Sequence, residues 1–270
     1  MAHMRGCIPS PRHRLARAVW VGSRLRDVIP PPNFATVCKD YDIAGNADYG
    51  DCVSAEESNA KKAYSVALSA PEVEIPGSTV VTWARKHGFL NGANLDDVLT
   101  AMQTEGMIDA SGTVHCDGPH LAVDWTSPQE LAAAIYTYKT VKIAVAANQL
   151  EKAVGNSNGW TLLKASADPN SDHCVGLHGY GSLSYLCGLL GVSVPAGQDP
   201  TQLCFLLYTW ATVGIVSNPA LQAIMAGGEA WVRSIGDVVD GQPNPPIPLP
   251  DPQPVPPNPD LAMNPDLTIR

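Results

Sequence analysis

A glycine turn directly precedes a cysteine at the start of a helical pattern. Gly50 and Asp51 come before Cys52, and the following residues to Tyr64 have the spacing of a helix that Asp51 can cap. Unpaired N–H groups and the partial positive charge at a helix start favour a thiolate over a thiol. The pattern therefore predicts a cysteine placed to act as a nucleophile.

A histidine-bearing strand is predicted more than a hundred residues downstream. Residues 173–178 carry His173 and His178 and lead into a glycine-rich stretch at 179–181, where we expect a turn. Residues five apart on an extended strand point to opposite faces, so only one of the two imidazoles can face Cys52. A cysteine at a helix start and a distant histidine form the two halves of a thiol–imidazole pair.

Composition excludes several classes of protein. The chain has 270 residues, 45% of them hydrophobic, and a net charge of −9, which disfavours nucleic acid and anionic membranes as partners. No apolar run reaches the roughly 18 residues that span a bilayer. Seven cysteines without CxxC spacing indicate neither a zinc site nor another cofactor. The odd count and the lack of a secretory pattern favour the cytoplasm, although one cysteine pair is left open as a bridge.

The chain changes character along its length. Helices are expected over 51–69, 78–87 and 94–106, and a further helix begins at Ser127-Pro128. Strands are expected over 121–125, 141–146, 159–163, 173–178, 204–210 and 230–233. The basic stretch 5–26 is a docking surface, a solvated arm or a face that caps the fold. Prolines dominate 241–265, which predicts an extended tail that serves as a spacer, as an attachment arm or as a ligand for an SH3-like groove.

Several segments together resemble the papain-like cysteine peptidases. In chain order they are residues 46–52 before the helix, the glycine-containing turn 88–99, the histidine strand with its glycines, and residues 207–210. The resemblance runs from about residue 29 to 216. It implies an α+β fold with a helical lobe at about 45–115, an antiparallel barrel-like lobe at about 116–238 and a cleft between them. Residues 1–28 would be an arm and 239–270 the tail.

The resemblance also implies roles for particular residues. Cys52 would be the nucleophile, His173 the general base and acid, and Asn46 an oxyanion donor in place of the family's glutamine. The position of the family's imidazole-orienting asparagine falls on Tyr208, which is a departure from the pattern. The residue after the nucleophile, Val53, is another departure, because the family has tryptophan there. The residues implied to line the substrate cleft are Gly92, Ala93 and Trp210.

Three functions remain open at this stage. The first is a thiol-dependent hydrolase that cleaves peptide or other amide bonds through an acyl-enzyme on Cys52. The second is an acyltransferase or isopeptidase, in which an amine replaces water at the same site. The third is a catalytically silent binding or structural module. The expected partner is a peptide or protein substrate, with neither a metal nor a cofactor.

Overall fold

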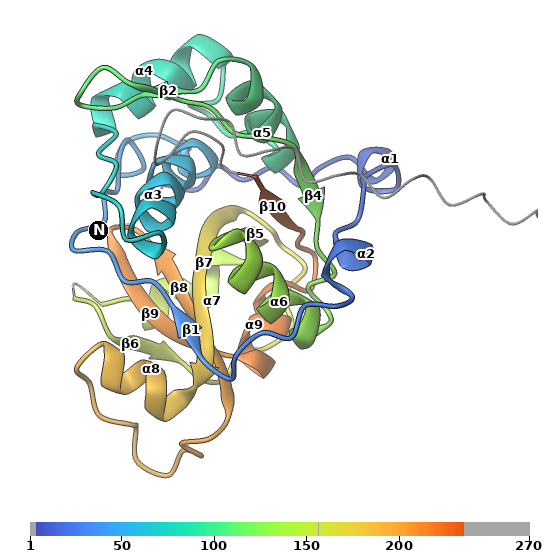
Figure 1. Ribbon diagram of the computed structural model, residues 1–270, viewed down its shortest axis with the longest axis vertical. Coiled ribbons are helices and arrows are strands. Elements are labelled where there is room, and N and C mark those ends of the chain that lie inside the picture. The colour runs from blue at the N-terminus through green and yellow to red at the C-terminus, as the bar shows by residue number, and fades with distance from the viewer. Residues whose placement is uncertain (1–3, 156, 235–270) are drawn as a thin grey trace, which may run out of the picture.

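Helices and one large sheet form the body of the protein (Figure 1). The structure, a computed structural model, describes residues 4–155 and 157–234. The helices are α1 (Arg12–Leu15), α2 (Gly22–Leu25), α3 (Cys52–Ala67), α4 (Gly77–His87), α5 (Leu95–Thr104), α6 (Pro128–Tyr138), α7 (Ala147–Ala153), α8 (Leu183–Leu189) and α9 (Asn218–Ile224). The strands are β1 (Phe34–Ala35), β2 (Met107–Ile108), β3 (Val114–His115), β4 (His120–Ala122), β5 (Val141–Val145), β6 (Trp160–Leu162), β7 (His173–Ser182), β8 (Leu203–Thr209), β9 (Thr212–Ser217) and β10 (Ala230–Arg233).

The large sheet has the strand order β4-β10-β5-β7-β8-β9-β6, and β1 adds to β7. Its neighbours are antiparallel except for β6 and β9, which run parallel. Within the described residues the sheet stays open, so the expected barrel-like lobe is a mixed sheet that does not close. Helices α4 and α5 and the small β2–β3 sheet lie at one end of the molecule, and α3 lies between them and the large sheet (Figure 1).

Helix α3 is buried along nearly its whole length, including its charged residues. Glu57 pairs with Lys142 of β5 and Arg233 of β10, and Lys61 pairs with Asp117. In the sequence, the acidic Glu56 and Glu57 precede Lys61 and Lys62, an order that favours a helix with these charges on its surface. The structure instead places them in a buried ion network, because β5 and β10 bring opposite charges against the helix. The network therefore fixes the orientation of α3 against the sheet.

Strand β7 extends further than the sequence predicts. Gly179 and Gly181 lie inside the strand rather than in a turn after it, because β1 pairs across this segment. A Cβ on Gly179 would lie 2.5 Å from the Cβ of Ala35, so the glycine permits this close approach. The register of β7 against β8 also shifts between Leu177 and Gly179, which marks a bulge.

Local signals placed most of the other elements. Gly88 ends α4 with φ of 79°, and the Ser127 side chain accepts the Glu130 N–H at the start of α6. The predicted strand at 121–125 is limited to β4, which ends at Ala122. The short helices α7, α8 and α9 and strand β9 were not predicted.

Part of the stretch predicted as an N-terminal arm packs against the body of the protein. Val21 and Leu25 are buried in the core of the sheet lobe, and Trp20 forms a bridge with Ala122 of β4. The predicted proline-rich tail, residues 239–270, lies outside the described residues. Within the described part of the chain, no helix combines the length and apolar character that a membrane span requires.

Candidate active site

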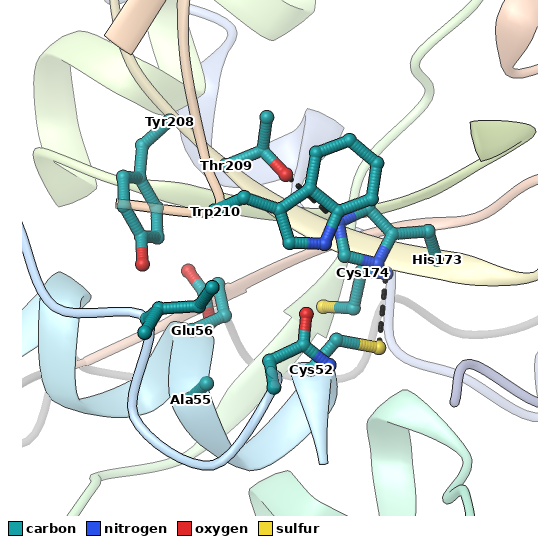
Figure 2. A pocket seen from close by; sticks show the side chains of 10 residues that line it. Cys52, Ala55, Glu56, His173, Cys174, Tyr208, Thr209 and Trp210 are labelled. Carbon is teal, nitrogen blue, oxygen red and sulfur yellow. Dashed lines mark hydrogen bonds between the residues drawn. The ribbon is translucent and has the colours of Figure 1, made fainter. Parts of the chain in front are cut away.

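Residues from three elements line one small cavity. Cys52 begins α3, His173 begins β7, and Thr209 and Trp210 lie at the end of β8 (Figure 2). Asn46, from the turn before α3, lines the same cavity. Its volume is about 10 Å³, enough for about one water molecule. The structure thus brings together the predicted cysteine, histidine, asparagine and tryptophan.

The Cys52 sulfur is buried and surrounded by backbone donors. It accepts the N–H of Cys174 at 3.4 Å, and the backbone N–H of Gly6 also hydrogen-bonds to it. Burial nevertheless raises the pKa of Cys52 to about 12, and these two N–H groups offset only part of that rise. The sequence predicted a lowered pKa from the helix start. Removal of the sulfur from water has the larger effect in this arrangement.

The imidazole of His173 has one contact at a ring nitrogen and another across its flat face. Its Nε2 lies 2.8 Å from the hydroxyl oxygen of Thr209. The Trp210 ring stacks on the imidazole, with centroids 4.2 Å apart and an angle of 16° between the planes (Figure 2). Trp210, which was predicted to line the cleft, thus packs against the face of the His173 ring.

The predicted third member, Tyr208, points elsewhere. Its hydroxyl donates to the backbone oxygen of Asp42 and accepts from Nδ2 of Asn59 at 2.7 Å. Successive residues of a strand face opposite sides, so Tyr208 and Thr209 of β8 cannot both turn toward His173. Thr209, one residue later, makes the contact with the imidazole. The sequence analysis did not identify Thr209. The alternation of side chains along the strand could have indicated it, but only after the register of β8 against β7 was known.

Asn46 lies at the cavity with its amide already engaged. Its Nδ2 donates to the Tyr49 carbonyl at 3.2 Å, and its side chain lies close to the carboxylate of Asp51. Burial raises the pKa of Asp51 to about 6, while the backbone N–H groups of Asp51 and Gly45 and the Asn46 amide act in the opposite direction. The turn before α3 therefore places an amide beside Cys52, as the sequence predicted.

Residues 4–10, here named the crossing segment, lie between the helical lobe and the sheet beside Cys52. The segment pairs with Ala93 through two backbone hydrogen bonds, Ala93 N–H to Gly6 O at 2.8 Å and Ile8 N–H to Ala93 O at 3.0 Å. On the sheet side, Cys7 N–H donates to the Asp172 carbonyl at 3.1 Å. Ala93, one of the residues predicted to line the substrate cleft, thus binds an extended segment of the same chain. No sequence pattern indicated this contact.

The second histidine of β7 is remote from this chemistry. His178 is fully buried, and its ring stacks near Tyr41 and Tyr208 at centroid distances of 6.0 and 5.8 Å. A histidine on the face of the strand away from Cys52 is expected to be a hydrogen-bonded structural residue, but neither ring nitrogen of His178 has a hydrogen-bond partner among the described residues. Burial lowers the pKa of His178 to about 3. The choice of His173 for the site agrees with this placement.

No group of three or more histidine, cysteine or carboxylate side chains suited to a metal ion occurs within residues 4–155 and 157–234. Cys7, Cys52 and Cys174 gather near the site, and each has a free thiol. Burial raises the pKa of Cys7 and Cys174 as well. The candidate site therefore has a thiol and an imidazole, with two further thiols nearby.

Comparison with solved structures identifies the fold. The chain is similar to digestive procathepsin L 3 of Tenebrio molitor larval midgut, with TM-score 0.59 and 12% identity over 77% of this chain and 71% of that one. It is also similar to the ragweed pollen allergen Amb a 11, a cysteine protease in its proform, with TM-score 0.60 and 10% identity over 83% and 70%. A structure on the mite allergens Blo t 1 and Der p 1 matches with TM-score 0.58 and 11% identity over 84% and 83%.

These likenesses show that the protein has the papain-like α+β fold, as the ordered motifs predicted. No protein-family model matches the sequence, and no curated protein matches it.

Proposed function

We propose that the protein is a thiol-dependent hydrolase that cleaves peptide or other amide bonds through an acyl-enzyme on Cys52. The observation that carries the proposal is the shared cavity of Cys52 and His173, with the imidazole held by Thr209 and Trp210. A thiol at a helix start, an imidazole and a residue that orients the imidazole are the three parts this chemistry needs.

The reaction proceeds in two halves. In the first, His173 takes the thiol proton, the sulfur attacks the substrate carbonyl, and the imidazolium returns that proton to the departing amine. With Nε2 bonded to Thr209, Nδ1 is the ring nitrogen that exchanges the proton. In the second half, His173 takes a proton from water, the hydroxide attacks the thioester, and the sulfur leaves and regains a proton. An acid and a free thiol result.

The tetrahedral intermediates carry a negative oxygen that requires donors. The backbone N–H of Cys52 is one candidate donor, and the amide of Asn46 is the other. The Asn46 amide must turn from its present partners to serve. Removal of one such donor costs about 3 to 4 kcal/mol of transition-state stabilisation in enzymes of this chemistry.

Substrate reaches Cys52 only after the crossing segment has moved. The segment hydrogen-bonds to both backbone polar groups of Ala93, and its Gly6 covers the Cys52 sulfur. Once it has moved, water reaches the thiol and removes the main cause of the raised pKa.

A peptide ester that releases a chromophore tests the proposal. We expect a stoichiometric burst, a mass increase on Cys52 equal to the acyl group, and neither signal in Cys52→Ala or His173→Ala. An added amine at equal acylation separates hydrolysis from acyl transfer, because a transferase gives the amide product. The proposal fails if Cys52 remains unacylated in a variant whose crossing segment is displaced.

A silent binding module is the second candidate, and one observation favours it. The Cys52 sulfur is buried and its pKa is about 12, which is the state of a structural thiol. Alkylation of Cys52 no faster than that of the buried Cys174, with the segment displaced, would select this alternative.

A further inference from the structure

Two residues of the crossing segment fit closely against the groups that surround them. The first is Arg5. Its guanidinium contacts the Glu151 carboxylate through Nε at 3.3 Å and Nη2 at 2.6 Å, and the Asp172 carboxylate through Nη1 at 2.6 Å. Glu151 belongs to α7, and Asp172 directly precedes His173. Two carboxylates from separate elements thus converge on one cation beside the catalytic histidine, a geometry suited to a guanidinium.

The second residue is Gly6, which lies where the crossing segment passes closest to the backbone of Gly50. A Cβ on Gly6 would lie 1.7 Å from the carbonyl oxygen of Gly50, and a Cβ on Gly50 would lie 2.8 Å from the Arg5 carbonyl. Backbone therefore passes backbone with no room for a side chain on either. Gly50 stands two residues before Cys52, and the Gly6 N–H reaches the Cys52 sulfur. Only glycine fits at this point of the crossing segment.

Beside Cys52, Ala93 and Asp172 bind the segment through backbone atoms, which any extended peptide offers. Further along the segment, the Ser10 hydroxyl donates to Asp96 at 2.9 Å and the Ser10 N–H donates to Glu229 at 2.9 Å. Selectivity beside Cys52 therefore comes from the carboxylate pair and from the narrow passage at Gly50.

We propose that Glu151, Asp172 and Gly50 form a specificity site for peptides in which a basic residue directly precedes glycine. Arg5 and Gly6 are its intramolecular occupants, which a substrate must displace. The proposal deepens and rests on the proposed function, because it names the substrate class of that same site. Recognition itself requires no catalysis, so the two can be tested separately.

The test measures protection of Cys52 from iodoacetamide in the Arg5→Ala/Gly6→Ala variant, in which the intramolecular occupants are removed. The probe is acetyl-Met-Arg-Gly-Ser-Ile-Pro-Ser-amide, which has the sequence of residues 4–10 with serine in place of Cys7. Two matched peptides replace its arginine by glutamate or its glycine by alanine. We expect each replacement to raise the concentration that gives half protection at least tenfold.

A change in the protein supplies the reciprocal measurement. Glu151 contacts Arg5 from a partly exposed helix face, so Glu151→Arg in the same variant alters the charge at the specificity site. We expect this change to raise the concentration of the arginine peptide that gives half protection. The corresponding concentration of the glutamate peptide should fall. Glu105→Arg, at the distant end of α5, is the matched control and leaves both values unchanged.

Equal protection by the three peptides, or protection by none, overturns the proposal. Hydrolysis of peptides without this preference would leave the function intact and remove the specificity site. Selective protection without acylation of Cys52 would support the specificity site and contradict the proposed hydrolase function.

Discussion

The hydroxyl oxygen of Thr209 lies 2.8 Å from Nε2 of His173, so a threonine holds the imidazole where the sequence pattern pointed to Tyr208. A hydroxyl accepts one hydrogen bond from the ring and fixes its orientation. The bond lies in a buried setting, where a hydrogen bond to a charged ring contributes roughly 1.5 to 3 kcal/mol. This contact gives the first prediction.

Replacement of Thr209 by valine removes the acceptor and keeps the shape of the side chain. We expect kcat/KM to fall roughly ten- to a hundredfold, because the imidazolium loses that hydrogen bond in the transition state. Thr209→Ser keeps the hydroxyl and should restore most of the activity. Steady-state kinetics on an ester or peptide substrate measures both.

Tyr208→Phe is the matched control on the neighbouring position. The tyrosine hydroxyl bonds to Asp42 and Asn59, so its loss should lower stability without a change in kcat/KM of the folded enzyme. A larger kinetic effect for Tyr208→Phe than for Thr209→Val would contradict the assignment of the orienting role.

The second prediction concerns the reactivity of the nucleophile. Gly6→Ala places a Cβ against the Gly50 carbonyl oxygen and should expel the crossing segment from Cys52. Because burial is the main cause of the raised pKa of Cys52, exposure to water should lower that pKa. Each unit of decrease gives about a tenfold gain in thiolate below the pKa, so we expect iodoacetamide to alkylate Cys52 at least roughly tenfold faster at pH 7.5.

Gly188→Ala serves as the control for this experiment. Gly188 lies in α8, and a Cβ added there would point into open space, so its replacement should leave the alkylation rate unchanged. Peptide mapping identifies the alkylated residue. A Gly6→Ala protein that is folded by circular dichroism and alkylates at the wild-type rate would show that the segment does not control access.

Local patterns in the sequence predicted the elements that depend on neighbours along the chain. Gly88 and Ser127 end and begin helices by their own conformation and hydrogen bonds, and the alternation at 141–146 marked β5. Cys52 was predicted from a helix start and the two histidines from a strand pattern, which are local properties, whereas the choice of His173 over His178 came from the resemblance to the papain-like peptidases. The order of the motifs along the chain then indicated the fold.

Contacts between distant positions were not predictable in the same way. The pairing of Ala93 with residues 6–8 leaves no periodic pattern in the sequence. From the sequence, Arg5 could be identified only as one member of a basic stretch, and not as a partner of Glu151 and Asp172. The choice between positions 208 and 209 required the strand register, which a single sequence does not fix. The burial of Glu57 beside Lys142 was also unexpected, since charges on a helix are usually solvated.

The third prediction tests this buried ion network. Lys142 is fully buried, contacts Glu56 and Glu57, and donates to the Val53 carbonyl at 2.8 Å in the first turn of α3. Lys142→Met leaves buried carboxylates short of a cation, so we expect the free energy of unfolding to fall by about 3 to 5 kcal/mol. Urea denaturation followed by circular dichroism measures the change.

An exposed ion pair provides the comparison. Lys86 pairs with Glu105 on the surface, and Lys86→Met should cost no more than about 1 kcal/mol, as is usual for solvated pairs. Similar losses for both lysines would mean that the network does not anchor α3 to β5.

The fourth prediction concerns stability in acid. Burial lowers the pKa of His178 to about 3, with the Arg233 charge as a smaller cause, whereas a histidine in an unfolded chain titrates near 6.5. The unfolded chain therefore binds the proton more readily. The contribution of His178 is complete above about pH 6.5 and falls by roughly 1.4 kcal/mol per unit as the pH drops toward 3.

Replacement of this buried imidazole tests the pH dependence. His178→Phe retains an aromatic ring beside Tyr41 and Tyr208 and cannot be protonated. We expect its unfolding free energy to depend less on pH between 6.5 and 4.5 than that of the wild type. Tyr41→Leu, which disturbs the same stack without removing the imidazole, should lower stability at every pH and keep the wild-type slope. Urea titrations at several pH values measure the slopes, and equal slopes for His178→Phe and the wild type would show that protonation of this buried ring does not drive the acid sensitivity.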